Sequence, residues 1–334
     1  MILVTGSTGL IGGHVTAKLL GKGHDIKVLV RADSHISSLK ETMGHDAIHA
    51  EQLFNNIMIC HGDLLDYDSI MNAMDGVDEV YHCAGYISFN PADKNRLYDI
   101  NANGTRNMVN AALESGVSKF GYVSSVAALN SEESEEISEA DFIHDAGFTS
   151  HYSSSKFYGE LEVWRGIAEG LRAVVINPSI VLGPGKRGTG SAGLFHAVRK
   201  GLKFYTDGIT GFVDVHDVSE IMIQLMEQEK FNERFIVSSE KYAYRDLFEQ
   251  IAAYLDVSAP KFPASQRLLN IAWRLARIGS FFTGRPPSIT KETAASANKQ
   301  SHYSNSKVTE TLNHKFLSVK DSLYNNCQLF LKEI

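Results

Sequence analysis

The first half of the chain alternates short apolar runs with helix-forming stretches, and this alternation limits the folds open to it more than any other feature. The runs that indicate buried strands are MILV (1–4), IKVLV (26–30), NIMIC (56–60), EVYHC (79–83), FGYVS (120–124) and AVVIN (173–177). Stretches of helical period, such as 10–22 and 101–115, lie between them. Such alternation predicts right-handed crossovers, so we expect an α/β fold with a doubly wound parallel sheet covered on both faces.

A glycine-rich turn joins the first strand to the first helix. Its spacing is G-x-x-G-x-x-G, which differs from the G-x-G-x-x-G dinucleotide fingerprint. Glycines three apart allow a tight turn and let a pyrophosphate approach the free N–H groups of a helix N-terminus. A purely structural turn is the alternative, but the strand–turn–helix context favours a nucleotide. The residues expected to bind the cofactor here are Gly6, Ser7, Thr8, Gly9, Leu10, Ile11 and Gly12.

Two later strand ends bear on which dinucleotide binds. The second strand ends at Arg31, where NAD-specific enzymes usually offer a carboxylate to the ribose hydroxyls. A guanidinium there would attract a 2′-phosphate, so we predict NADP(H) as the preferred cofactor, with NAD(H) left open. The alternative is that Arg31 is only an exposed strand-end residue. Asp63, with its neighbour Leu64, follows the third strand and is predicted to lie at the adenine.

Three polar residues form the predicted reacting centre. Tyr152 and Lys156 lie four apart on a predicted helix and therefore share one face. Tyrosine is a poor base at neutral pH, but a neighbouring ammonium stabilises its phenolate. Ser125 follows the fifth strand, at the edge where parallel sheets bind ligands, and could hold a substrate oxygen. A Tyr–Lys pair on a solvated helix face is the alternative reading of the same spacing.

The strand–helix pattern loosens after about residue 180, where helical stretches dominate and RFIVSS (234–239) is one further strand candidate. With 334 residues the chain has ample length to bury a core. We therefore predict a Rossmann domain over 1–178, with a returning strand near 234–239. A smaller, mostly helical substrate-binding lobe is predicted over 179–334.

Bulk properties exclude several classes of partner. The net charge of -7 gives no concentrated basic surface for nucleic acid. No stretch reaches the roughly 18 apolar residues of a membrane span. Three cysteines without a CxxC motif predict a reducing, cytoplasmic location and no metal site, and a chain that starts with a strand leaves no room for a signal peptide. The acidic stretch 131–141 is expected to be a solvated loop.

Taken in order, these motifs resemble the extended short-chain dehydrogenase/reductase family, also called the NAD-dependent epimerase/dehydratase family. The matching segments are TGSTGLIG (5–12), GDL (62–64), HCAG (82–85), NANGTRN (101–107), VSSVAAL (123–129), YSSSK (152–156), NPSIVLGP (177–184) and FVDVHDV (212–218). The resemblance implies that Ser125, Tyr152 and Lys156 are the catalytic trio and that Lys156 also binds the nicotinamide ribose. It further implies cofactor contacts from Ala84, Gly85, Tyr86, Pro178, Ser179 and Ile180. Asn101 matches a family asparagine whose role is catalytic or only structural.

The chain lacks several residues that are typical of the sugar-nucleotide enzymes of this family, and their absence indicates which branch of the family it resembles. Sugar-nucleotide dehydratases that resemble this family carry an Asp-Glu pair after the catalytic Ser or Thr, where this chain has Val126 and Ala127. Related epimerases carry Arg and Asn where this chain has Asn177 and Ile180, and a further Arg where it has Thr210. A buried diphosphate would then be poorly compensated. The chain looks more like dihydroflavonol reductases and related carbonyl reductases or hydroxysteroid dehydrogenases.

We therefore predict an NADP(H)-dependent reductase/dehydrogenase that interconverts a ketone and a secondary alcohol on a small, fairly apolar substrate. A sugar-nucleotide epimerase is the alternative enzyme, and a non-catalytic NADP-sensing regulator is the alternative from another class. A homodimer is left open. The amphipathic segment 265–282 is expected to be a core helix, a lid over the substrate or a membrane-surface helix. As a lid, its Leu269, Trp273, Phe281 and Phe282 would wall an apolar pocket.

Overall fold

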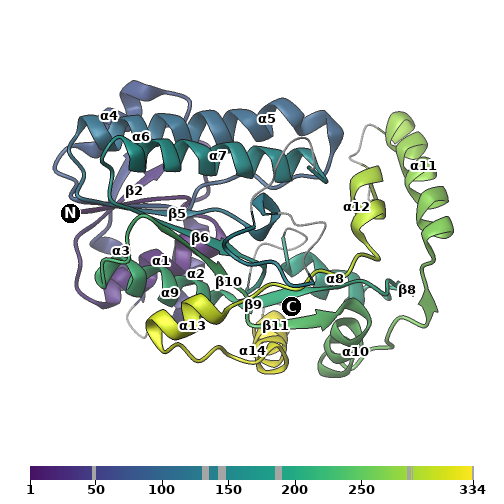
Figure 1. The fold of residues 1–334 in the computed structure, drawn as a ribbon. Helices are drawn as coiled ribbons and strands as arrows, with labels where there is room; N and C mark the ends of the chain where they lie inside the picture. The colour runs from purple at the N-terminus through teal and green to yellow at the C-terminus, as the bar shows by residue number, and fades with distance from the viewer. Residues whose placement is uncertain are drawn as a thin grey trace.

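The computed structural model describes residues 1–46, 50–129, 135–141, 148–184, 190–283, 287 and 289–332 (Figure 1). Its central sheet has seven parallel strands, in the order β10 (Glu233–Val237), β6 (Ala173–Pro178), β5 (Lys119–Val123), β4 (Glu79–His82), β1 (Ile2–Thr5), β2 (Ile26–Val30) and β3 (Met58–His61). Each apolar run of the sequence coincides with one of these strands. The order reverses between β1 and β4, which creates the crevice where doubly wound sheets bind ligands. The predicted doubly wound α/β fold is confirmed.

Helices cover both faces of this sheet, as Figure 1 shows. One face carries α1 (Leu10–Gly21), α2 (Ser37–Asp46), α3 (Ala50–Asn55), α9 (Val215–Glu227) and α13 (Ser306–Leu312). The other carries α4 (Tyr67–Met74), α5 (Lys94–Tyr98), the π-helical turn η2 (Asp99–Asn103), α6 (Gly104–Glu114) and α7 (His151–Ala168). Strand residues alternate between two separate cores, because Val4 and Val28 face the first helical layer and Leu3 and Val80 face the second. Burial on both faces explains why the strands are continuous apolar runs.

A second, smaller sheet lies in the C-terminal half. Its strands are β11 (Glu240–Ala243), β9 (Ile209–Asp214) and β7 (Ile180–Leu182), beside a two-stranded pair of β12 (Phe262–Pro263) and β8 (Phe204–Tyr205). Helices α8 (Ala192–Arg199), α10 (Tyr244–Tyr254), α11 (Gln266–Thr283), α12 (Lys291–Ser296) and α14 (Val319–Lys332) complete this region. Its core includes Leu182, Phe212, Leu247 and Leu323. The sequence did not predict this sheet, because its strands are short and interrupted by glycine and charged residues.

Between β9 and β11 of the small sheet, the chain returns to the large sheet through α9 and β10. Helix α9 packs against α1, and β10 pairs in parallel with β6, so that Phe235 lies opposite Ile176. The turns η1 (Pro91–Asp93) and η3 (Val126–Ala128) follow β4 and β5 at the carboxyl edge of the sheet. Within the described ranges no helix is long and apolar enough to cross a membrane.

The acidic stretch 131–141 differs from its expected form as a solvated loop. Residues 131–134 lie outside the described residues, but the rest of the stretch packs onto the edge of the sheet. Ile137 is buried and forms an isolated bridge with Tyr303. A Glu139 carboxylate oxygen accepts a hydrogen bond from the Ile236 N–H at 2.9 Å. The side chain therefore satisfies a donor on the edge strand β10, which would otherwise be open to pairing.

Candidate active site

The glycine turn after β1 packs its backbone directly against two other segments. Gly6 has φ +70, and a Cβ there would lie 2.6 Å from the Ala84 backbone nitrogen. A Cβ on Gly12 would lie 2.3 Å from the Gly6 carbonyl oxygen. Both glycines are therefore needed for this turn to sit beneath the loop that follows β4, because side chains would collide with backbone atoms.

The N-terminus of α1 is left open to an anion. Gly9 is its N-cap and has no side chain with which to satisfy the first N–H groups of the helix. The Ser7 hydroxyl oxygen is buried and has no hydrogen-bond partner among the described residues. Leu10 packs toward Gly183, and Ile11 packs on the first core. These features fit a dinucleotide pyrophosphate at the predicted loop.

Arg31 and Asp63 both lie at the carboxyl ends of neighbouring strands. Their loops are joined by the hydrogen bond from the Gly62 N–H to the Val30 carbonyl, at 3.0 Å. The exposed Arg31 guanidinium pairs with Asp33, with Nε 3.1 Å from Oδ1. One Asp63 oxygen accepts from the Leu65 N–H at 2.9 Å. Each side chain thus has a local partner that a bound cofactor would have to replace or share.

The other residues predicted to contact the cofactor after β3 and β6 also lie at the carboxyl edge of the large sheet. The Leu64 side chain packs on the second core, and its carbonyl accepts from the Asn107 amide at 2.8 Å. Pro178 ends β6, Ser179 donates from its N–H to the Val237 carbonyl at 3.1 Å, and Ile180 begins β7 opposite Phe212.

Asn101 fastens the loop that follows β4 to α7. Its side-chain oxygen accepts from the Tyr86 N–H at 2.7 Å, and its nitrogen donates to the Tyr86 carbonyl and to the Ser155 hydroxyl, both at 2.9 Å. The residue lies in the π-helical turn η2, an irregularity common at functional sites. A Cβ on Gly85 would lie 3.6 Å from the Lys156 Nζ, so the loop Ala84–Tyr86 borders the predicted reacting centre.

The structure brings Ser125, Tyr152 and Lys156 together at the same edge. Ser150 begins α7 by accepting the Ser153 N–H at 3.0 Å, which sets where the helix starts. The first turn of α7 is held beside Ser125, because the Ser153 hydroxyl donates to the Ala127 carbonyl at 2.5 Å. The Ser125 oxygen accepts from the Ala127 N–H at 3.1 Å, which leaves its own proton free to be donated.

The Lys156 side chain is buried, and its ammonium group has partners that hold it in place. Its ammonium donates to the Val123 carbonyl at 2.8 Å and lies 4.9 Å from the centre of the Tyr122 ring. Burial lowers the pKa of Lys156 to about 8, while the Glu160 carboxylate raises it. Burial raises the pKa of Tyr152, and the neighbouring Ser125 hydroxyl opposes that rise. The ring of Tyr152 meets Phe89 edge-on at 5.8 Å, which gives the site an apolar wall.

A buried ionic network behind the trio was missed by sequence reasoning. A Glu160 oxygen lies 2.5 Å from the Arg234 guanidinium and accepts from the Trp164 indole at 3.1 Å. The Asn177 amide donates to the other Glu160 oxygen at 2.8 Å and to the Ser125 carbonyl at 3.1 Å. The only local signal was Glu160, four residues after Lys156 and thus on the same helix face.

Comparisons with known proteins agree with this geometry. The family model described as "NAD dependent epimerase/dehydratase family" matches residues 2–237. The chain is 32% identical over 267 residues to tetraketide alpha-pyrone reductase 2 of Arabidopsis thaliana, covering 74% of this chain and 80% of that protein. It is 25% identical over 328 residues to a Synechocystis protein named "Putative dihydroflavonol 4-reductase", covering 96% and 91%.

A solved structure extends the match to the whole fold. The crystal structure of gox2253 is similar with a TM-score of 0.82 at 29% identity, covering 100% of this chain and 98% of that one. The match of the family model spans the glycine turn, the trio and the returning strand β10. The chain is an NAD(P)-dependent oxidoreductase, and it belongs to the NAD-dependent epimerase/dehydratase family.

Proposed function

We propose that the protein is an NADP(H)-dependent reductase/dehydrogenase that interconverts a ketone and a secondary alcohol on a small, fairly apolar substrate. The observation that carries this proposal is that α7 is held against the end of β5 next to Ser125: the Ser153 hydroxyl donates to the Ala127 carbonyl at 2.5 Å and the Lys156 ammonium to the Val123 carbonyl at 2.8 Å, with Tyr152 one helical turn before Lys156. That arrangement suits the transfer of one proton at a carbonyl oxygen.

The chain's own residues have distinct tasks in this reaction. A bound nicotinamide supplies or accepts the hydride. The Ser125 hydroxyl, oriented by the Ala127 N–H, donates a hydrogen bond to the substrate oxygen. Tyr152 donates its proton to that oxygen in reduction and recovers it in oxidation. The ammonium of Lys156 stabilises the phenolate that forms and binds the nicotinamide ribose, and the Val123 carbonyl fixes its position.

The surroundings of the trio favour a carbonyl substrate over a sugar nucleotide. Val126 and Ala127 follow Ser125, and neither can transfer a proton for dehydration. Asn177 points inward to Glu160 and Ser125, so it is not available to a diphosphate. Ile180 offers only apolar surface. The names of the reductase relatives point the same way, and a sugar-nucleotide epimerase remains the alternative.

Turnover by a matched pair of variants tests this proposal. NADPH oxidation with aromatic or alicyclic ketones is expected for the wild type and is lost in Tyr152→Phe, whose cofactor affinity stays nearly unchanged. Tyr158→Phe, on the exposed side of the same helix, is the control and keeps its activity. Substantial activity in Tyr152→Phe would refute the mechanism. Conversion of UDP-glucose or UDP-galactose, followed by NMR, would restore the epimerase, and absence of any turnover would favour the NADP-sensing regulator.

Arg31 supports a preference for NADP(H) over NAD(H). Its pairing with Asp33 is exposed and worth about 0–1 kcal/mol, whereas a 2′-phosphate offers a charge-assisted, bidentate partner. NADPH is expected to bind at least about tenfold tighter than NADH, which corresponds to about 1.4 kcal/mol. Arg31→Ala should remove this difference, and Asp33→Asn should tighten NADPH alone. Equal affinities of the wild type for both cofactors would contradict the assignment.

We also propose the division of labour along the chain. Residues 1–178 with the returning strand bind the cofactor, and the remainder of 179–334 forms the substrate-binding lobe. A cytoplasmic location is proposed from the cysteines, because Cys60, Cys83 and Cys327 are all free. Substitutions in the lobe after Ile180 test the division, because they should change the KM for the ketone and leave the Kd for NADPH unchanged.

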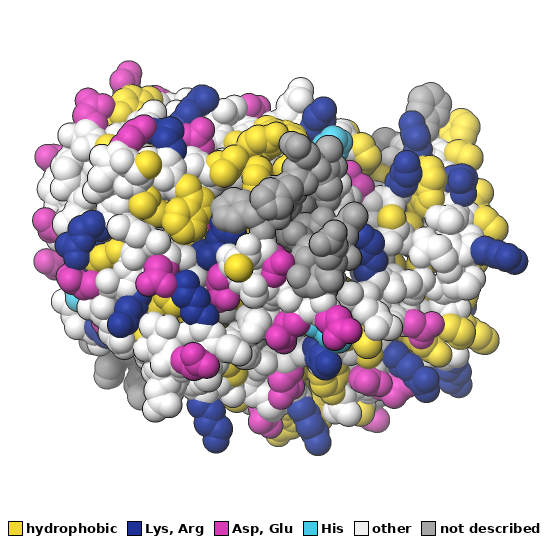
Figure 2. Space-filling model, viewed as in Figure 1, with side chains coloured by type: hydrophobic (Ala, Val, Ile, Leu, Met, Phe, Trp, Pro, Cys, Tyr) yellow, Lys and Arg dark blue, Asp and Glu magenta, His cyan; other side chains and the backbone are white. Residues whose placement is uncertain are grey.

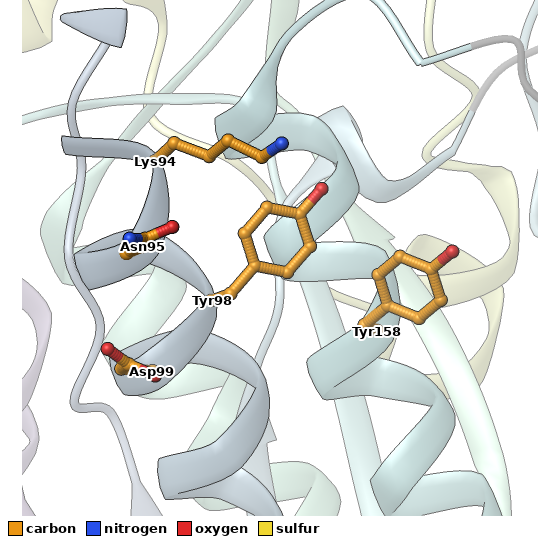
Figure 3. Close-up of a pocket in the computed structure, with 5 residues that line it drawn as sticks. All are labelled: Lys94, Asn95, Tyr98, Asp99 and Tyr158. Carbon is orange, nitrogen blue, oxygen red and sulfur yellow. The ribbon is translucent and has the colours of Figure 1, made fainter. Parts of the chain in front are cut away.

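A homodimer is proposed through the outer surface of α5 and α7. Figure 3 shows Tyr98 and Tyr158 side by side there, with Lys94, Asn95 and Asp99 around an open pocket of about 550 Å³. The two tyrosine rings are 6.1 Å apart, and Leu161 is exposed beside them. Light scattering is expected to give twice the chain mass for the wild type and one chain mass for Leu161→Glu. A wild-type monomer would contradict the proposal.

A further inference from the structure

Helix α11 carries apolar residues on two opposite faces. On one face, Leu269 and Trp273 pack against Ala294 of α12. The other face has a stripe of exposed apolar side chains with exposed fractions from 39% to 80%. The stripe consists of Leu268, Ile271, Leu275, Ile278 and Phe282. Intervals of three and four residues place these side chains in one line along the helix. A helix that only completed a core, as one reading of the sequence expected, would leave this second face polar.

This outer stripe, as we call those five residues, lies at one end of the molecule. Figure 1 shows α11 at the periphery, beyond α12 and away from the large sheet. In Figure 2 apolar and basic side chains alternate along this end. Strand β12 leads into α11, and its exposed Phe262 meets the exposed Phe204 of β8 with ring centres 5.8 Å apart. Two further exposed apolar side chains therefore lie where the chain enters the helix.

The charge of this segment is opposite to that of the whole chain. The net charge of the protein is -7, yet residues 257–291 contain no Asp or Glu. The basic residues of this segment are Lys261, Arg267, Arg274, Arg277, Arg285 and Lys291. Arg267 and Arg274 each directly precede a residue of the stripe and are seven residues apart, so both lie along the same edge of it. Both are exposed.

The arginines beside the stripe and the side toward which the stripe faces indicate which partner covers it. A second copy of α11 would bring Arg267 and Arg274 to the flanks of a helix pair, where α11 offers no carboxylate to meet them. A lid would turn its apolar stripe toward the substrate, but here the stripe faces away from the side that packs on α12. An apolar line edged by arginines is instead complementary to lipid chains beneath anionic headgroups.

We propose that α11 docks the protein on the surface of an anionic lipid bilayer. The helix lies in the plane of the interface, with the outer stripe in the acyl boundary and Arg267 and Arg274 on lipid phosphates. Phe204 and Phe262 enter the same boundary beside the stripe, as apolar rings do on membrane-surface helices. Such docking is peripheral and needs no membrane-spanning helix. It does not depend on the proposed hydride transfer.

Vesicle co-sedimentation of the full chain tests this. Phosphatidylcholine vesicles are compared with vesicles that contain about one-third phosphatidylglycerol, at low and high salt. The wild type is expected to bind the anionic vesicles at least about tenfold better, with a loss of binding at high salt. The double variant Arg267→Gln/Arg274→Gln should lower the partition coefficient roughly 30-fold, and Leu275→Ser and Ile278→Ser should each lower it roughly tenfold.

Matched controls replace equally exposed residues elsewhere. Met58→Ser removes an exposed apolar side chain of β3, and Lys320→Gln/Lys332→Gln removes two exposed charges of α14, so both should bind like the wild type. All variants are compared only after their Tm values match that of the wild type. Wild-type binding in the α11 variants, or equal binding to both vesicle types, overturns the proposal. So does a lipid-free dimer that Leu275→Ser dissociates, or a change in ketone KM in that variant without lipid binding.

Discussion

The buried pair of Glu160 and Arg234 allows a prediction of stability to be worked from the structure. Both side chains are almost fully buried, with the two charged groups 2.5 Å apart. Glu160→Gln keeps the shape of the side chain but removes the charge. Its one remaining oxygen can still accept from Trp164, while the amide nitrogen faces the Asn177 amide, which is also a donor. Loss of one partner from a buried pair costs about 3–5 kcal/mol, because the other charge stays in a low-dielectric position.

This loss converts into a measurable change in melting temperature. With 334 residues and about 2.1 cal/mol/K of unfolding entropy per residue, the total is about 0.7 kcal/mol/K, so Tm should fall by about 4–7 °C. Glu162→Gln, two residues along α7, is the matched control. Its pairing with Arg165 at 2.8 Å is partly exposed, so its loss should cost less than about 1 °C.

Calorimetry of the two variants beside the wild type provides the measurement, supplemented by urea unfolding. A second readout separates the network's effect on the site from its effect on stability. Glu160 raises the pKa of Lys156, so Glu160→Gln should move the alkaline limit of activity to lower pH. Equal Tm values for Glu160→Gln and Glu162→Gln, with an unchanged pH profile, would refute the reasoning.

Three further predictions concern the site itself. Ser125→Ala should lower kcat by roughly 10²-fold or more, measured as NADPH oxidation, because a positioned donor is lost. Gly12→Ala should abolish NADPH binding in a fluorescence titration, since its Cβ would lie 2.3 Å from the Gly6 oxygen; Gly21→Ala, in the same helix with nothing within 4 Å, should bind normally. The kcat/KM for reduction should fall as pH rises through about 8, where Lys156 loses its proton, and a flat profile to pH 10 would contradict this.

Local signals in the sequence were sufficient for the large sheet. Continuous apolar runs indicated each of its strands, and their alternation with helices indicated parallel pairing. The Tyr–Lys spacing placed both side chains on one face of α7, and the strand-end position of Ser125 placed it at the same edge. These features depend on residues close together in the chain, which is why patterning alone could predict them.

The parts that sequence reasoning missed depend on distant contacts. Glu160, Asn177 and Arg234 come from α7, β6 and β10, and only the pairing of β6 with β10 brings them together. Arg234 is part of a predicted strand, where an isolated charge indicates an edge position rather than a buried pair. For α11 the periodicity indicated an amphipathic helix, but not which of its two apolar faces would be covered.

The charge of Lys156 links the predicted catalytic trio to the buried network that sequence reasoning missed. A buried ammonium is unfavourable, and three neighbours oppose its loss of charge: the Val123 carbonyl, the Tyr122 ring and the Glu160 carboxylate. With a pKa of about 8, roughly nine-tenths of Lys156 is protonated at pH 7. The nearby His82 adds no competing charge, because burial, with Lys156 beside it, lowers its pKa to about 3. Arg234 pairs with Glu160 in turn, so a side chain on β10 contributes to the electrostatic environment of Lys156.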